Sequence, residues 1–306
     1  MQLTGPFDVD LQVHTTASDG TCTPTEVVEL AAGKGIRVLA ITDHDSILGL
    51  AEATAASVRL GGSTAFTTGV EVVPAIELST RDEPDKDFME LHLLGYFIDP
   101  DDPALNETLK RVIQGRVDQK RSQIQKLQEL GFDLPEEEVL ALASGAPSRS
   151  HIAEVLLRHN PDRVTGKQQL FDEYLSVHGK AHVPRPFELS LEEAIQLVVA
   201  AGGVPVLSHP ADYPHVRDPV GMVRHAMSLG LRGIEVNYPY DKNRRHFGIS
   251  KTELHALIRR FDALADELGL LKTGGSDFHG DRKPIELGEM GLVYDDYLRF
   301  KAACEH

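Results

Sequence analysis

The sequence predicts an α/β barrel that is interrupted by a helical insertion. Short apolar runs alternate with helical segments in the first and last thirds of the chain, a pattern typical of sheets with crossover helices. Between them, residues 103–185 show helical patterns and no convincing strand. The length of 306 residues accommodates a barrel with such an insertion. We therefore expect one barrel built from residues 1–102 and 186–306, with a helical domain at 103–185.

The first hundred residues alternate between strand and helix patterns. Residues 7–13 predict a strand, and the helix after it begins at Thr23-Pro24, an N-cap followed by Pro at the first helical position. Gly33 and Gly35 end this helix. The apolar run at 38–42 is typical of a parallel strand covered on both faces. The remaining elements expected here are a helix at Ile47–Leu60 and strands at Val70–Leu78 and Leu91–Phe97.

The rest of the chain divides into the insertion and a second set of barrel elements. Seven apolar residues at helical spacing predict a long helix after Pro103 that ends at Gly131: Leu105, Leu109, Val112, Ile113, Ile124, Leu127 and Leu130. Shorter helices are expected at Glu136–Ala143, Ser150–His159 and Lys167–His178. After Pro184 three helix–strand pairs complete the barrel: Leu191–Ala201 with Val204–Leu207, Val220–Leu229 with Gly233–Val236, and Lys251–Leu268 with Leu271–Thr273.

The charge of the chain is unevenly distributed. The 31 Lys and Arg residues against 47 Asp and Glu residues give a formal net charge of −16, which argues against broad binding to long nucleic acids. Residues 103–185 hold 12 basic and 11 acidic residues, whereas the remainder holds 19 and 36. The acidic excess therefore lies entirely in the predicted barrel.

The sequence favours a cytoplasmic protein. Two cysteines, Cys22 and Cys304, cannot form a disulfide framework, so a reducing compartment is expected. The longest apolar stretch, Leu197–Leu207, covers 11 residues, about half of what a bilayer requires. No basic region followed by an apolar one marks a secretory signal, and we expect no membrane contact.

Side chains suited to metal ligation cluster at the ends of the predicted strands. Gln12 and His14 lie two residues apart on the first strand, so both point to one face. In an α/β barrel the C-terminal strand ends form one rim, which holds the active site. One histidine there is more often structural than a ligand, but five recur with carboxylates nearby. The set suits two or three divalent ions of Mn²⁺, Fe²⁺ or Zn²⁺: Gln12, His14, Asp19, His44, Glu77, His92, His209, Asp277 and His279.

These motifs resemble the polymerase-and-histidinol-phosphatase (PHP) superfamily over nearly the whole chain. The matching segments are DLQVHTTASDG (10–20), ITDHD (41–45), AIELS (75–79), LHLLGY (91–96), LSHP (207–210) and GGSDFH (274–279). In the insertion, PSRSHIAEVL (147–156) and FDEYL (171–175) resemble the branch of nucleoside 3′,5′-bisphosphate phosphatases and 5′–3′ exoribonucleases. The resemblance implies a distorted (β/α)₇ barrel that holds a trinuclear metal cluster.

The resemblance also implies how the ligands divide among three metals. The first metal would take His14, Glu77 and Asp277; the second would share Glu77 and add His92 and His209; the third would take Asp19, His44 and His279. Position 12 is usually histidine in the family, and here it is Gln12. An amide oxygen is a poorer donor than imidazole to Zn²⁺ or Fe²⁺, so Gln12 either ligates weakly or only forms hydrogen bonds beside the cluster.

The implied chemistry is attack of a metal-activated hydroxide on phosphorus. Asp277 is the candidate for orienting the nucleophile or taking its proton, and His209 or His279 for protonating the leaving oxygen. Asp43 and Asp45 either fix histidine tautomers or hold loops.

Positive charge for the substrate is expected from the insertion. Arg149 precedes a predicted helix and would grip a second phosphate, together with Ser148 and the backbone amides of the helix N-terminus. His151 either faces the substrate or caps the helix. Arg116 is a further candidate, although for Arg116, Lys120 and Arg121 a solvated helix face is the simpler interpretation.

The sequence therefore predicts a metal-dependent phosphoesterase. Its expected partners are small phosphorylated nucleotides, a 3′,5′-bisphosphonucleotide or a nucleoside monophosphate, and beyond these the 5′ ends of short RNAs, with no long duplex nucleic acid. The alternatives are a histidinol-phosphatase-like enzyme, or a degenerate PHP module that binds nucleotide without turnover because of Gln12. Hydrolysis of a C–N bond in a related metal barrel would explain the ligands but not the arginine.

Overall fold

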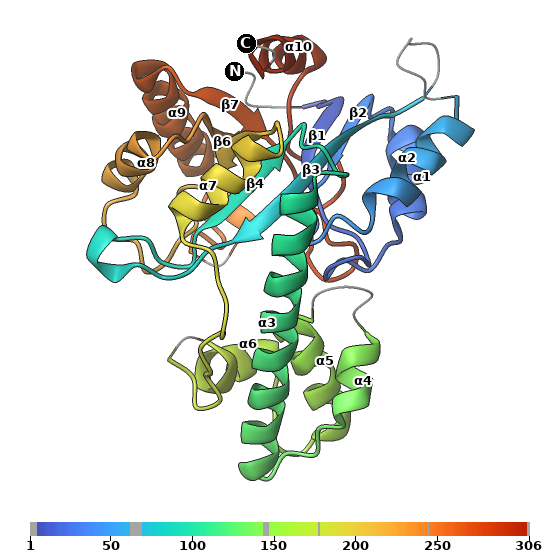
Figure 1. The fold of residues 1–306 in the computed structure, drawn as a ribbon, viewed down its shortest axis with the longest axis vertical. Coiled ribbons are helices and arrows are strands. Elements are labelled where there is room, and N and C mark those ends of the chain that lie inside the picture. The colour runs from blue at the N-terminus through green and yellow to red at the C-terminus, as the bar shows by residue number, and fades with distance from the viewer. Residues whose placement is uncertain (1–4, 62–68, 143–146, 177, 244, 305–306) are drawn as a thin grey trace.

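Seven strands form one sheet in chain order from β1 to β7 in the computed structural model (Figure 1). The structure describes residues 5–61, 69–142, 147–176, 178–243 and 245–304. The strands are β1 (Val9–Val13), β2 (Val38–Ile41), β3 (Glu71–Ser79), β4 (His92–Tyr96), β5 (Val204–Leu207), β6 (Gly233–Asn237) and β7 (Leu271–Gly274).

The two ends of this sheet approach each other and nearly close it into a barrel. The backbone N–H of His14, just after β1, donates to the carbonyl oxygen of Phe278 over 2.9 Å. The N–H of Asp277 donates to the carbonyl oxygen of Gln12, also over 2.9 Å. The predicted seven-stranded, distorted barrel is confirmed, and its seam joins two ligand-rich segments that are about 265 residues apart.

Strand β4 runs against its neighbours, so the predicted parallel arrangement is wrong at this position. It pairs antiparallel with both β3 and β5, whereas the other strand pairs are parallel. The segment between β3 and β4 contains only a 3₁₀ turn, η1 (Pro84–Lys86), in place of the crossover helix that a parallel pair needs. The register sets Ser79, the last residue of β3, opposite His92, the first of β4. His92 therefore lies at the rim where the parallel strands end.

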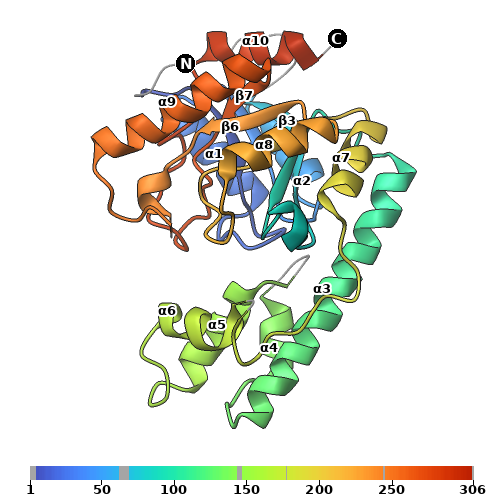
Figure 2. The ribbon, with the colours of Figure 1, turned by 90° about the vertical axis from the view of Figure 1, so that its left-hand side faces the viewer.

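Helices cover the sheet from two sides. Helix α1 (Pro24–Lys34) begins at a capping box between Thr23 and Glu26 and ends at Gly35 with φ 77°, as the sequence predicts. It packs with α2 (Leu50–Arg59) over β1 and β2. The other side is covered by α7 (Leu191–Ala200), α8 (Pro219–Ser228) and α9 (Lys251–Leu268) (Figure 2).

The barrel interior is apolar, and its end away from the insertion is covered by α10 (Tyr294–Cys304), a helix that the sequence interpretation omitted (Figure 1). Tyr297 and Phe300 of α10 pack with the inward side chains of the strands, among them Leu11 and Tyr96. The hydroxyl of Tyr96 donates to the carbonyl oxygen of Leu11 over 2.9 Å. This packed interior supports the opposite rim, where the candidate ligands lie.

The insertion is a set of helices with a hydrophobic core of its own. It contains α3 (Pro103–Glu129), α4 (Glu136–Ala141), α5 (Arg149–His159), α6 (Lys167–Leu170) and the π-type turn η2 (Phe171–Leu175). The predicted helix at 167–178 is thus shorter than expected; Val177 and Ala143, the predicted end of α4, lie outside the described residues. The first turns of α3 pack on the barrel through Leu105 and Leu109, and its last turns pack in the insertion core through Ile124 and Leu127.

No helix in the described part of the chain combines the length and the apolar character that crossing a membrane requires.

Replacing Phe300 with alanine should destabilise the barrel strongly, because its buried ring is lost from a packed interior. We expect a loss of about 3–5 kcal/mol in the free energy of unfolding, measured by chemical denaturation. Leu298→Ala on the same helix is the matched control, since that side chain is 44% exposed, and should cost about 0.5 kcal/mol or less. Equal losses in both variants would show that α10 does not complete the core.

Candidate metal centre

The carboxylate of Glu77, near the end of β3, lies among four imidazoles. Its Oε2 is 3.0 Å from Nε2 of His14 and 3.4 Å from Nδ1 of His44. Its Oε1 is 3.0 Å from Nδ1 of His92 and 3.4 Å from Nε2 of His209. These histidines follow or begin four different strands, so the barrel alone brings them together.

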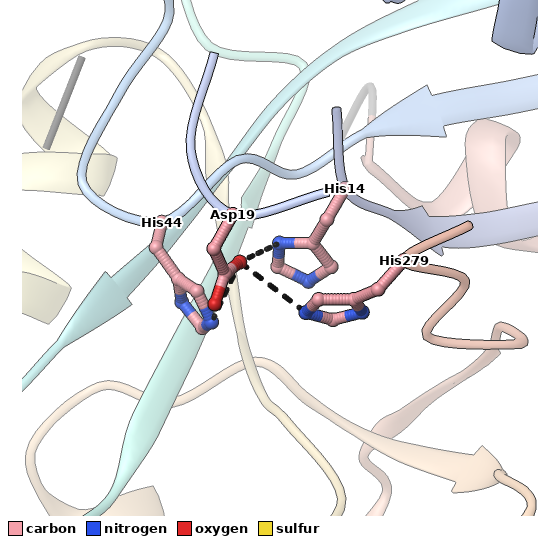
Figure 3. Close-up of side chains that lie close together, drawn as sticks. All are labelled: His14, Asp19, His44 and His279. Atoms are coloured by element: carbon pink, nitrogen blue, oxygen red, sulfur yellow. Dashed lines mark ion pairs between the residues drawn. The ribbon is translucent and has the colours of Figure 1, made fainter. Parts of the chain in front are cut away.

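A second carboxylate, Asp19 from the loop after β1, faces three imidazoles (Figure 3). Its Oδ1 lies 3.3 Å from Nε2 of His279 and 4.0 Å from the nearest nitrogens of His14 and His44. The rings of His14 and His279 stack with their centroids 4.1 Å apart. Because His14 also contacts Glu77, the two carboxylates share one continuous cluster.

The third carboxylate, Asp277, joins His14 and His279 on the β7 side. Its Oδ1 is 3.3 Å from Nε2 of His14 and 3.4 Å from Nδ1 of His279. Its Oδ2 accepts a hydrogen bond of 2.8 Å from the hydroxyl of Tyr238 and contacts the ammonium of Lys283. Although burial raises the pKa of Asp277, Lys283 and the imidazoles hold it well below the usual range. Asp277 is therefore an ionised acceptor.

The chemistry of this cluster fits divalent metal ions. Among the described residues, several buried ligand-type atoms have no hydrogen-bond partner, including both ring nitrogens of His14, Oδ1 of Asp19 and Oε2 of Glu77. Buried lone pairs that face one another without partners are costly, and a cation between them removes the cost. Two groups have ligand atoms within 4.8 Å of one another and could each hold an ion: His14, Asp19, His44 and His279; and His44, Glu77 and His92.

The electrostatics of the buried groups agree with a site made for cations. Burial raises the pKa values of Glu77 and Asp19, but the surrounding imidazoles lower both well below the usual range. Burial lowers the pKa of His14, but the neighbouring carboxylates of Asp277 and Glu77 outweigh it and raise the pKa to about 10. The carboxylates are thus charged inside the protein and require positive charge beside them.

Gln12 lies at the centre of the rim and uses only one end of its amide. Its Nε2 donates to Oε1 of Glu77 over 3.2 Å and to Oγ of Ser208 over 3.0 Å. Its Oε1 is buried without a hydrogen-bond partner in the described part of the chain. The contacts of Nε2 are those expected if Gln12 only forms hydrogen bonds beside the cluster. Its Oε1 remains available to a cation, so ligation by Gln12 stays a prediction.

Asp43 and Asp45 hold loops and do not contact the histidine rings. Asp43 accepts from the N–H of Thr15 over 2.7 Å and from the hydroxyls of Thr15 and Ser18, which fixes the turn that carries Asp19. Oδ1 of Asp45 accepts from the N–H of Ser79 over 2.8 Å, and its Oδ2 is 2.5 Å from Nε of Arg116. Of the two roles that the sequence left open for Asp43 and Asp45, these contacts match the holding of loops.

The substrate-binding candidates from the insertion face this rim. Ser148 caps α5 together with His151: the N–H of Ser148 donates to Nδ1 of His151, and the N–H of His151 donates to Oγ of Ser148. The helix-capping alternative for His151 is therefore what these contacts show. Nη1 of Arg149 lies 3.7 Å from Oε1 of Glu90, in the segment between β3 and β4.

A cavity of ≈ 290 Å³ connects the insertion to the metal-ligand cluster. Its walls include His92 from the cluster and three cations from the insertion: Lys120, Arg149 and Arg185. Lys120 is buried, and its ammonium donates to Oε1 of Gln119 over 2.8 Å. Burial and the nearby arginines lower the pKa of Lys120 well below its usual range.

The solvated helix face expected for Arg116 and Lys120 is thus wrong. Both side chains are buried because the helix leans over the barrel rim, and Arg116 reaches Asp45 and Ser79 there. Arg121 alone is half exposed and pairs with Glu136. Arg185 went unnoticed in the sequence, since nothing in its local sequence marks it; its Nη1 lies 3.8 Å from Oδ2 of Asp45.

The chain is similar to known proteins across its length. The model of the PHP domain matches residues 10–183. A 3′,5′-nucleoside bisphosphate phosphatase of Chromobacterium violaceum is 33% identical, with 89% of this chain and 87% of that protein covered. A 5′–3′ exoribonuclease of Haemophilus influenzae is 31% identical over 92% and 93%. The crystal structure of a protein from Bifidobacterium adolescentis assigned as a metal-dependent phosphoesterase superposes with a TM-score of 0.80 at 27% identity, covering 98% and 97%.

Glu77→Gln should weaken metal binding, because one oxygen that faces two imidazoles becomes an amide nitrogen. We expect the affinity for Mn²⁺ to fall by more than about tenfold, measured by calorimetry, with less metal per chain in the purified protein. The control Glu71→Gln alters the same strand away from the rim, where Glu71 accepts from Tyr297 and Lys301. Unchanged metal content in Glu77→Gln would remove Glu77 from the ligand set.

Proposed function

This chain belongs to the PHP domain family, and we propose that it is a metal-dependent phosphoesterase that removes phosphate from small nucleotides. The observation that carries the proposal is the cavity that His92 shares with Lys120, Arg149 and Arg185. One substrate molecule would then place a phosphate ester at the metal centre and a second phosphate in this cavity. A 3′,5′-bisphosphonucleotide has this character, and a relative with 33% identity bears that activity in its name.

The second phosphate accounts for a group of four cations, of which Arg116 and Lys120 are buried. Arg116 and Arg185 share Asp45 as a counter-charge, Arg185 also pairs with Glu188, and Arg149 lies near Glu90. No carboxylate of the described residues lies within ion-pair distance of Lys120. Buried cations require an anion, and phosphate oxygens accept several charge-assisted hydrogen bonds at once.

Two or three divalent ions of Mn²⁺, Fe²⁺ or Zn²⁺ are the cofactors in this proposal. The first would be held by His14, Glu77 and Asp277 with Gln12 as a weak ligand, and the others by Glu77 with His92 and His209 and by Asp19 with His44 and His279. When bound, such metals activate water and neutralise phosphoryl oxygens. The unpartnered ring nitrogens and carboxylate oxygens of the cluster support this assignment.

The roles of the protein groups follow from their hydrogen bonds. Asp277 is held by Tyr238 and Lys283 on one oxygen, which leaves the other directed at the cluster, where it can orient a nucleophile and accept its proton. His209 and His279 border the same space and are the candidates for protonating the leaving oxygen. Arg149 and Arg116 would bind the substrate from the insertion side, together with Ser148 and the ring nitrogen of His151 that does not cap α5.

The proposal extends to the organisation and setting of the protein. Residues 103–185 serve as a substrate-contacting domain, and 1–102 with 186–306 as the metal-binding barrel. The separate core of the insertion supports this division. A cytoplasmic location and the absence of long duplex nucleic acid as a partner are supported by the two cysteines and the net charge of −16.

A second candidate substrate is the 5′ end of a short RNA. The relative from Haemophilus influenzae, named a 5′–3′ exoribonuclease, favours it. The same cations would then hold the terminal 5′-phosphate while the next linkage lies at the metals. Gln12 is the one feature that favours the degenerate-module alternative, a PHP module that binds nucleotide without turnover.

Purified protein with Mn²⁺ should release inorganic phosphate from adenosine 3′,5′-bisphosphate and lose this activity with EDTA, because the attacking water in this proposal is activated by the metals. The measurement is a phosphate-release screen over mononucleotides, bisphosphonucleotides and short 5′-phosphorylated RNAs, on protein of known metal content. Full activity in EDTA, or no release from any of these substrates, would contradict the proposal.

Lys120→Met should raise KM for adenosine 3′,5′-bisphosphate by about tenfold or more, because a charge-assisted hydrogen bond to the second phosphate is lost. The rate with p-nitrophenyl phosphate, which has one phosphate, should change little. Lys110→Met, on the exposed face of α3, is the matched control and should leave both substrates unaffected. Equal loss with both substrates would remove Lys120 from the second-phosphate site.

Gln12→His should increase the metal bound per chain and the phosphatase rate at limiting Mn²⁺, because imidazole is a better donor than an amide oxygen. Elemental analysis and a rate titration with Mn²⁺ measure both effects. A protein that binds more metal but still releases no phosphate would support the degenerate-module alternative.

A further inference from the structure

The loop after β7 leaves the metal centre and returns to it within a few residues. His279 faces Asp19, and four residues later the ammonium of Lys283 contacts the carboxylate of Asp277. Between them, Gly280 has φ 65° and the N–H of Asp281 donates to Oγ1 of Thr21 over 3.0 Å. Both ends of the loop are therefore fixed on the ligand cluster, and Arg282 must lie beside it.

The guanidinium of Arg282 is largely buried but incompletely bonded. Its Nη2 lies 3.1 Å from Oε2 of Glu154 on α5, so the side chain spans from the barrel to the insertion, with 12% of it exposed. Its Nε and Nη1 are buried and have no hydrogen-bond partner among the residues that the structure describes. These two N–H groups are therefore available to an acceptor outside the protein, and phosphoryl oxygens are suitable acceptors.

Arg282 lies between the ligand-bearing loop and α5, because His279, three residues before it, faces Asp19, and its guanidinium reaches Glu154. His151, one turn before Glu154 on α5, is buried, and burial together with the charge of Arg282 lowers its pKa to about 4. The carboxylate of Asp19 raises the pKa of the same imidazole. Arg282 thus stands apart from Lys120, Arg149 and Arg185, which line the cavity on the His92 side.

We propose that Arg282 is a catalytic residue whose Nε and Nη1 donate to oxygens of the phosphoryl group that is hydrolysed at the metal centre. The inference rests on the proposed phosphoesterase function and deepens it. The planar guanidinium fits two oxygens of one phosphoryl group. Negative charge grows on these oxygens as the ester bond to the leaving oxygen breaks and the bond from the attacking water forms, so their binding accelerates the reaction.

The test compares two variants that both break the pair between Arg282 and Glu154. Arg282→Gln removes the donors and should lower kcat by about 100-fold with both adenosine 3′,5′-bisphosphate and p-nitrophenyl phosphate, with less change in KM. Glu154→Gln keeps the guanidinium and should lower kcat by less than about threefold. In Arg282→Ala, added guanidinium ion should restore part of the rate. Metal content and thermal unfolding establish that all variants are folded and loaded.

Binding of inorganic phosphate to the manganese-loaded protein, measured by calorimetry, gives a readout independent of turnover. Its affinity should fall about tenfold in Arg282→Gln and stay near the wild-type value in Glu154→Gln. This measurement tests Arg282 even if no phosphate ester in the screen is hydrolysed. Equal losses in the two variants would reduce Arg282 to a tether between loop and helix. A loss confined to the bisphosphate would assign it to the second phosphate; both results would overturn the proposal.

Discussion

A buried carboxylate among four imidazoles is the constraint on which the rest of this structure depends. Glu77 contacts His14, His44, His92 and His209 from inside the barrel rim, where water is excluded. Such a cluster keeps its geometry only if the strands below it are rigid, and the apolar interior closed by α10 provides that support. The rim also holds residues with left-handed backbones, Asp45, His209 and Asp277, an arrangement that costs free energy and recurs at functional sites.

The insertion complements this acidic barrel with buried positive charge. Helix α3 belongs to both cores, so its middle passes over the rim and carries Arg116 and Lys120 into the space beside the cluster. Asp45 then binds the guanidinium of Arg116 on α3 and lies near that of Arg185, the last residue of the insertion. The carboxylate of Asp45 thus joins the barrel to both places where the chain passes between barrel and insertion. These contacts fix the distance between the ligand cluster and the cation-lined cavity.

The reversal of β4 has a direct consequence for the site. A parallel strand in this position would carry its first residue to the far end of the barrel, below the apolar interior. Because β4 runs antiparallel, His92 at its start pairs with Ser79 and lies at the ligand rim. The short connection through η1 therefore determines the direction of β4, and this direction places the imidazole of His92 in the cluster.

The sequence by itself determined the barrel, the position of the insertion and the candidate ligands, because strand-end histidines and carboxylates are local patterns that recur with the period of the fold. The capping box at Thr23 and the glycine at position 35 likewise determine where α1 begins and ends. The tertiary structure alone decided that Arg116 and Lys120 are buried, and that Asp43 and Asp45 hold loops. It also decided that Arg185 lines the cavity beside His92 and that Arg282 pairs with Glu154. Burial and charge pairing depend on which segments meet across long separations in the chain, and no pattern within a single segment records that.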